Sequence, residues 1–187
     1  PLRAPGDRPL VLLSNDDGYA SRGIAALRDG LREAFTVVLV APETEQSAAS
    51  HALSLHRPLR IREVEPEVFA IDGTPADCVY VALHAVGRVL PRPPDLVVSG
   101  INPGLTLASS AHTEADLAAV ARLTTRIAQE LLAAPRTGRT LLNLNVPRAW
   151  TGELRATHLG ERIYDQAVEF RTDPRGRDYL WIGGPGA

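Results

Sequence analysis

Two adjacent carboxylates, Asp16 and Asp17, follow a run of four aliphatic residues and precede Gly18. An apolar run that ends in turn residues predicts a strand buried on both faces. The carboxylates are then expected at the carboxyl end of a parallel strand, where open α/β sheets bind ligands. Two like charges side by side repel unless a cation or hydrogen-bond donors neutralise them. The alternative is a solvated turn in which Asp17 caps the next helix.

Two more oxygen donors follow later apolar strands. Ser47 lies in the polar loop 41–51 after an expected strand at 35–40, and Asn102 follows an expected buried strand at 95–99. Carboxylate, hydroxyl and amide oxygens suit Mg²⁺, Mn²⁺ or Ca²⁺ rather than a soft metal. Such a cation polarises phosphoryl groups and lowers the pKa of water, which predicts hydrolysis without a covalent intermediate. The alternatives are that Ser47 and Ser50 cap a short helix and that His51 is a structural histidine.

The order of the elements predicts an α/β fold: a Rossmann-like, three-layer domain with a mostly parallel sheet. Helices are expected at 23–34 after the cap Ser21, after the cap Thr74, and after the cap Thr113. The helix after Thr74 is expected to bury Val79, Leu83 and Val86. Further strands are expected at 59–65, 68–71 and 140–146.

A change of character near residue 150 predicts two parts, a catalytic domain at 1–150 and a C-terminal hairpin arm at 151–187. The arm is expected to pair residues 162–171 with 178–182 through a turn at 173–176. An isolated hairpin is marginally stable, so the arm is expected to pack on its own domain or on another subunit.

Composition excludes several classes of function. A net charge of −2 argues against a nucleic-acid polymer or an anionic membrane as partner. The single cysteine, Cys78, excludes an internal disulfide and a cysteine-based zinc site. No stretch is apolar and long enough to span a bilayer, and no secretory signal is present, which makes the cytoplasm the expected compartment. Dinucleotide, ATP-binding and serine-hydrolase fingerprints are also missing.

Several motifs in order resemble the SurE (survival protein E) family over nearly the whole chain. They are Ser-Asn-Asp-Asp-Gly at 14–18, Ala-Pro at 41–42, Gln-Ser at 46–47, Ser-His at 50–51, Asp-Gly-Thr-Pro-Ala-Asp-Cys at 72–78, Ser-Gly-Ile-Asn-Pro-Gly at 99–104 and Leu-Asn-Leu-Asn-Val-Pro at 142–147. The resemblance implies a metal-dependent phosphatase of nucleoside 5′- and 3′-monophosphates that also cleaves short polyphosphate. It implies a C-terminal arm exchanged in homodimers or homotetramers. It also implies a divalent cation, Mg²⁺ or Mn²⁺, held by Asp16, Asp17, Ser47 and Asn102.

Around that cation, Asn15, Gly18 and Ser50 are expected to meet phosphate oxygens, and His51 is the candidate for protonating the leaving alkoxide. One departure from the family follows Gly104, where the hydroxyl- and glycine-rich phosphate cradle is missing from the sequence. Either this segment is truly lost or it is left out of the printed sequence, and omission is favoured because the loss of a core strand would leave helix faces uncovered. A true loss would favour the alternative of a non-catalytic nucleotide- or metal-binding module. A half-domain of a sugar-nucleotide transferase is a third interpretation, but it requires a second lobe for the acceptor.

Overall fold

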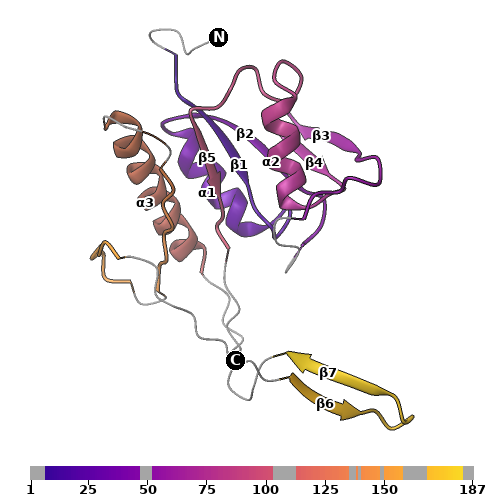
Figure 1. Cartoon of the computed structure of the whole chain (residues 1–187). Coiled ribbons are helices and arrows are strands. Elements are labelled where there is room, and N and C mark those ends of the chain that lie inside the picture. Colours follow the sequence, from indigo (N-terminus) through magenta and orange to yellow (C-terminus); the bar gives the residue numbers. More distant parts are fainter. Residues whose placement is uncertain are drawn as a thin grey trace. The chain divides into compact units, whose positions relative to one another are not determined.

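A computed structural model describes residues 7–46, 52–102, 113–134, 138, 140–147, 150–157 and 168–182. Its central sheet has the strand order β3-β4-β2-β1-β5 (Figure 1). Strand β1 pairs in parallel with β2 and β5, β2 pairs in parallel with β4, and β3 is antiparallel to β4. The expected mostly parallel α/β sheet is therefore confirmed. The strands are β1 Leu10–Ser14, β2 Thr36–Pro42, β3 Ile61–Glu65, β4 Val68–Ile71 and β5 Leu96–Ser99.

Alternate residues of the central strands face two different helix layers. Val11 and Leu13 of β1 join a core cluster with α1 (Arg22–Arg32) and α3 (Glu114–Ala133). Leu10 and Leu12 join a second cluster with α2 (Pro75–His84) on the opposite face. This alternation produces the three layers of a Rossmann-like domain, with helices on both faces of the sheet (Figure 1).

The three predicted helix caps are confirmed. Ser21 caps α1, so the alternative in which Asp17 caps this helix is wrong. Thr74 and Thr113 each form a capping box with the aspartate three residues later, Asp77 and Asp116. Local hydrogen-bond chemistry thus fixes where each helix begins, independently of the rest of the fold.

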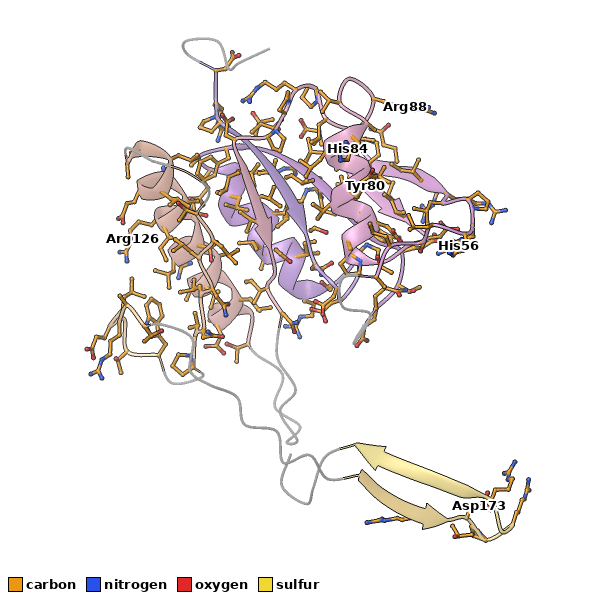
Figure 2. All side chains as sticks on the ribbon, in the orientation of Figure 1. His56, Tyr80, His84, Arg88, Arg126 and Asp173 are labelled. Carbon is orange, nitrogen blue, oxygen red and sulfur yellow. The ribbon has the colours of Figure 1, made fainter. Side chains whose placement is uncertain are left out.

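The buried side of α2 agrees with the prediction only in part, since Val79 packs against the second core cluster as expected. Cys78 and Ala82 are buried, whereas Leu83 is 40% exposed and Val86, just beyond the helix, is 39% exposed. On the outward side the Tyr80 and His84 rings stack with centroids 4.3 Å apart (Figure 2). Asp77 is buried as well, and its carboxylate closes the capping box with Thr74 and accepts a hydrogen bond from the backbone N–H of Ser54.

Two strand predictions also need correction. Residues 140–147 form no strand, and Leu141 is 93% exposed. Apolar alternation alone does not make a strand; the segment also needs a neighbouring strand for its backbone hydrogen bonds. In addition, β5 is an edge strand and not a fully buried one, because Val97 is 43% exposed.

The chain divides into two compact units, Pro1–Ala149 and Trp150–Ala187. In the second unit β6 (Val168–Thr172) pairs antiparallel with β7 (Asp178–Ile182). Asp173 holds the connecting turn, since its carboxylate accepts hydrogen bonds from the backbone N–H groups of Arg175 and Arg177 (Figure 2). The predicted hairpin is therefore present in these residues, while residues 162–167 lie outside those described. None of the helices described is both long and apolar enough to cross a membrane.

Candidate metal centre

Asp16 and Asn102 meet at the carboxyl ends of β1 and β5 although 86 positions separate them in the sequence. The amide Nδ2 of Asn102 lies 3.3 Å from Oδ1 and 3.4 Å from Oδ2 of Asp16. The cause is strand order: β1 and β5 are parallel neighbours, and Ser14 stands opposite Ser99 in the register. Residues two and three positions beyond that pair therefore emerge at the same edge of the sheet.

Asp17 supplies a carboxylate that the described part of the chain leaves unsatisfied. Its Oδ2 atom is buried and has no hydrogen-bond partner among the residues that the structure describes. Burial, together with the negative charges of Asp16 and Glu45, raises the pKa of the Asp17 carboxyl. Both effects disfavour the ionised form, and a cation bound at this position would relieve both.

Asn15 holds the loop that carries the two carboxylates. Its side chain is 1% exposed, and its Nδ2 donates to the carbonyl oxygen of Gly18 at 3.1 Å and to Oγ of Ser21 at 2.8 Å. Gly18 has a φ of 93°, a left-handed conformation that favours glycine. Within the described ranges, the Oδ1 atom of Asn15 has no hydrogen-bond partner. Both amide hydrogens of Asn15 thus point into the loop, and the predicted contact of this residue with phosphate stays a prediction.

Backbone hydrogen bonds join the β1 loop to the loops that follow β2 and β5. The N–H of Gly100 donates to the carbonyl oxygen of Ser14 at 3.0 Å, and the N–H of Gln46 donates to that of Asp16 at 2.8 Å. The N–H of Tyr19 donates to the carbonyl oxygen of Pro42 at 3.0 Å. The segments from which the sequence predicts cation ligands are therefore held against one another by the main chain.

The described donors fit a hard divalent cation. They are the two carboxylates and the Asn102 amide, all oxygen ligands, and one carboxylate oxygen is buried without a partner. Within the part of the chain that the structure describes, no three His, Cys, Asp or Glu side chains cluster closely enough to hold a metal by themselves. The remaining predicted site residues, Ser47, Ser50 and His51, lie outside the described residues.

Comparison with known proteins decides the family. Residues 11–113 match the family described as Survival protein SurE. A curated relative from Sorangium cellulosum, named 5'-nucleotidase SurE, is 51% identical over 96% of this chain and 80% of its own length. The chain belongs to the SurE family.

Other SurE proteins support the same conclusion. The 5'-nucleotidase SurE of Myxococcus xanthus is 41% identical over 93% of this chain and 76% of its own length. The crystal structure of the SurE protein from Aquifex aeolicus matches with a TM-score of 0.74 and 31% identity, over 94% of this chain and 82% of that one. The resemblance in the sequence motifs and the α/β fold are thereby confirmed.

The aligned region of a SurE relative is longer than this chain. The alignment with the Sorangium protein runs over 207 positions against the 187 residues of this chain. That relative therefore carries at least 20 residues in the aligned region that have no counterpart here. The departure expected after Gly104 stays a prediction.

Sequence reasoning missed two contributors to the site. Gln46 belongs to the Gln-Ser motif at 46–47, but it acts through its backbone N–H, which every residue except proline has, so its residue type did not indicate this contact. Gly23 lies in the first turn of α1, where a glycine forms no recognisable sequence motif. The backbone of Ile101 nevertheless packs against its Cα. Only the folded structure shows either contact.

Proposed function

We propose that this protein is a divalent-metal-dependent nucleotidase that hydrolyses nucleoside 5′- and 3′-monophosphates to nucleoside and phosphate, and that it also cleaves short polyphosphate. The observation that carries the proposal is the meeting of Asp16 and Asn102 beside the buried, unpartnered Oδ2 of Asp17. The names of the relatives supply the substrate class, since curated SurE proteins up to 51% identical are called 5'-nucleotidases.

Asp16, Asp17 and Asn102 would hold the cation, with Ser47 as the fourth ligand and Mg²⁺ or Mn²⁺ as the ion. A divalent ion supplies positive charge to phosphoryl oxygens and makes water more acidic. An ion would stabilise the charged form of the Asp17 carboxylate, because burial and the negative charges of Asp16 and Glu45 raise its pKa. The Asn102 side chain contributes a neutral amide oxygen once the amide rotates its Oδ1 toward the ion.

The other predicted residues act on the substrate. Asn15 fixes the loop through Gly18 and Ser21, so that the carboxylates keep one geometry. Gly18 and Ser50 would meet phosphate oxygens. Hydrolysis breaks the bond between phosphorus and the ester oxygen, the oxygen of a water molecule becomes part of the phosphate, and one proton must reach the nucleoside alkoxide. His51 is the proposed donor of that proton.

Phosphate release from a panel of nucleoside 5′- and 3′-monophosphates and tripolyphosphate tests the proposal. We expect turnover that EDTA abolishes and that added Mn²⁺ or Mg²⁺ restores. The variant Asp16→Asn should show only background release. Asp29→Asn, which makes the same charge change on an exposed residue of α1, should match the wild type. Turnover that survives both EDTA and Asp16→Asn would contradict the proposed metal dependence.

We further propose that the second unit, the arm with the β6–β7 hairpin, joins copies of this chain. A two-stranded hairpin is marginally stable alone and gains stability by packing against another surface. Sedimentation of the full chain at several protein concentrations should show a dimer or a tetramer. A monomer at every concentration would contradict this role for the hairpin.

A further inference from the structure

Gly23, in the first turn of α1, occupies a place that admits no side chain. It is buried, and a Cβ atom added there would collide with the carbonyl oxygen of Ile101. It would also lie 3.3 Å from the Ile101 carbonyl carbon and 3.4 Å from the Ile101 Cβ. The main chain leaving β5 therefore rests directly on the start of α1, and only glycine permits this approach.

The residue seated on Gly23 immediately precedes Asn102. Ile101 packs its side chain against the core cluster that contains Ile24 and Leu27 of α1. On its other side Gly100 is tied to β1 through the hydrogen bond to the Ser14 carbonyl. The backbone before Asn102 is thus fixed from both sides, and the Asn102 amide lies 3.3 Å from Asp16.

We infer that Gly23 is a positioning residue for the metal centre: its missing side chain lets the Ile101 backbone settle on α1, which places Asn102 beside Asp16. The inference rests on the proposed function, in which Asn102 is a metal ligand. Gly23 itself touches neither the cation nor the substrate. It sets the distance between two ligands that come from different strands.

The expected effect of a Cβ at this position is large for so small a change. Relieving the collision requires the Ile101 carbonyl group to move by about 1 Å, since ordinary van der Waals contact with a Cβ begins near 3.4 Å. Metal ligands must lie within about 0.2 Å of their ideal distances. Loss of residues that support the ligands of a metal typically weakens its binding about 10- to 100-fold. We expect a loss of this size for Mn²⁺ binding by Gly23→Ala.

The same helix offers a matched control. A Cβ at Gly30 would lie 3.0 Å from the Cβ and 3.3 Å from the carbonyl carbon of Ala121 on α3. Gly30→Ala therefore makes the same chemical change with the same gain in helix propensity and also crowds a helix contact. Its crowding falls between α1 and α3 and not on the loop that carries Asn102. Both variants should change stability, but only Gly23→Ala should weaken Mn²⁺ binding.

The test is a titration of the full chain with Mn²⁺, in which electron paramagnetic resonance measures the bound ion. Circular dichroism confirms that each variant is folded. We expect Gly23→Ala to raise the Kd for Mn²⁺ about 10- to 100-fold and Gly30→Ala to leave it unchanged. In an Asn102→Ala background, Gly23→Ala should add no further loss, because the ligand that it displaces is already gone. Equal Kd values for wild type and Gly23→Ala would overturn the inference, and so would equal losses in the two glycine variants.

Two further outcomes separate this inference from the proposed function. A wild-type protein that binds no Mn²⁺ would refute the metal centre, and the role of Gly23 with it. If Gly23→Ala does not fold, Ile101→Ala takes its place, since it keeps the glycine but removes the packing that seats the loop on α1. Ile101→Ala should also raise the Kd for Mn²⁺, and an unchanged Kd would overturn the inference while leaving the metal centre intact.

Discussion

Replacing Asp17 by asparagine should change stability in opposite directions with and without metal. The wild-type carboxylate carries a buried oxygen that has no partner, and burial and the charges of Asp16 and Glu45 disfavour its ionised form. Asparagine keeps the shape of the side chain and removes the charge. The variant is therefore expected to be the more stable protein without metal and the less stable one when metal is abundant.

The magnitude without metal follows from the charge, because the asparagine amide occupies the same place and gains no partner that the carboxylate oxygen lacks. A buried polar group without a partner costs about 1–3 kcal/mol and more when it is charged, and we take about 1 kcal/mol for removing the charge because the Asp17 side chain is only half-buried. A gain of about 1 kcal/mol should raise Tm by about 2–4 °C for a chain of this length.

With Mn²⁺ at about 100 times its Kd, binding stabilises the wild type by about 2.7 kcal/mol. The variant lacks one of the ligands and should gain little. The wild type should then be the more stable of the two by about 1.7 kcal/mol, which is this binding term less the gain of the variant.

Thermal unfolding monitored by circular dichroism, in EDTA and then in excess Mn²⁺, measures both differences. Asp29→Asn serves as the control for charge, because Asp29 is an exposed residue of α1. It should stay within about 0.5 kcal/mol of the wild type and keep the full response to Mn²⁺. A variant Asp17→Asn that melts below the wild type in EDTA, or that responds to Mn²⁺ as the wild type does, would refute the reasoning.

Two other predictions concern α2. Asp77, 3% exposed, accepts hydrogen bonds from the backbone N–H groups of Ser54 and Thr74, each at 2.9 Å. Asp77→Ala should therefore lower the free energy of unfolding by about 2–3 kcal/mol in urea titrations, and a change below about 0.5 kcal/mol would count against this role. Burial alone would raise the pKa of Asp77, but these hydrogen bonds lower it on balance. Its contribution should thus be complete above about pH 3.9, the ordinary pKa of aspartate, and be lost as the pH falls through the lower folded pKa, a loss that Asp77→Ala should not show. Burial and the Asp77 charge raise the pKa of the Cys78 thiol to about 12. Ellman's reagent should therefore leave Cys78 unmodified in the native protein and react with it in urea, and rapid native labelling would show that the thiol is accessible.

The sequence was most informative where local chemistry decides the structure. A capping residue and its partner lie within four positions, so Thr74 and Thr113 could be recognised without knowledge of the fold. The buried run before Asp16 also specified its own strand, because a continuous apolar stretch of that length suits a central parallel strand. The position of Asp16 and Asp17 at the end of that strand followed directly.

Prediction failed where the outcome depends on a distant partner. Helical spacing predicts that Leu83 is buried, but spacing alone fits more than one buried face of the helix. Packing against the sheet decides which face is buried, and here that face contains Cys78 and Ala82. The segment 140–146 has the composition of a strand, yet these residues pair with none of the described strands. Both errors have one cause. A local sequence pattern shows which residues of a helix or strand are suited to burial, but it does not show which neighbouring element packs against them.

The metal centre combines both kinds of information. The oxygen donors were visible in the sequence because each follows an apolar strand, but their convergence depends on β1 and β5 being neighbours in the sheet. The backbone just before Asn102 also rests on Gly23 through Ile101, a close main-chain contact that involves no functional side chain. The motif residues therefore determine which side chains bind the cation. Glycines and backbone hydrogen bonds determine where those side chains lie. Substitutions at Gly23 should consequently impair metal binding although every predicted ligand residue is still present in the sequence.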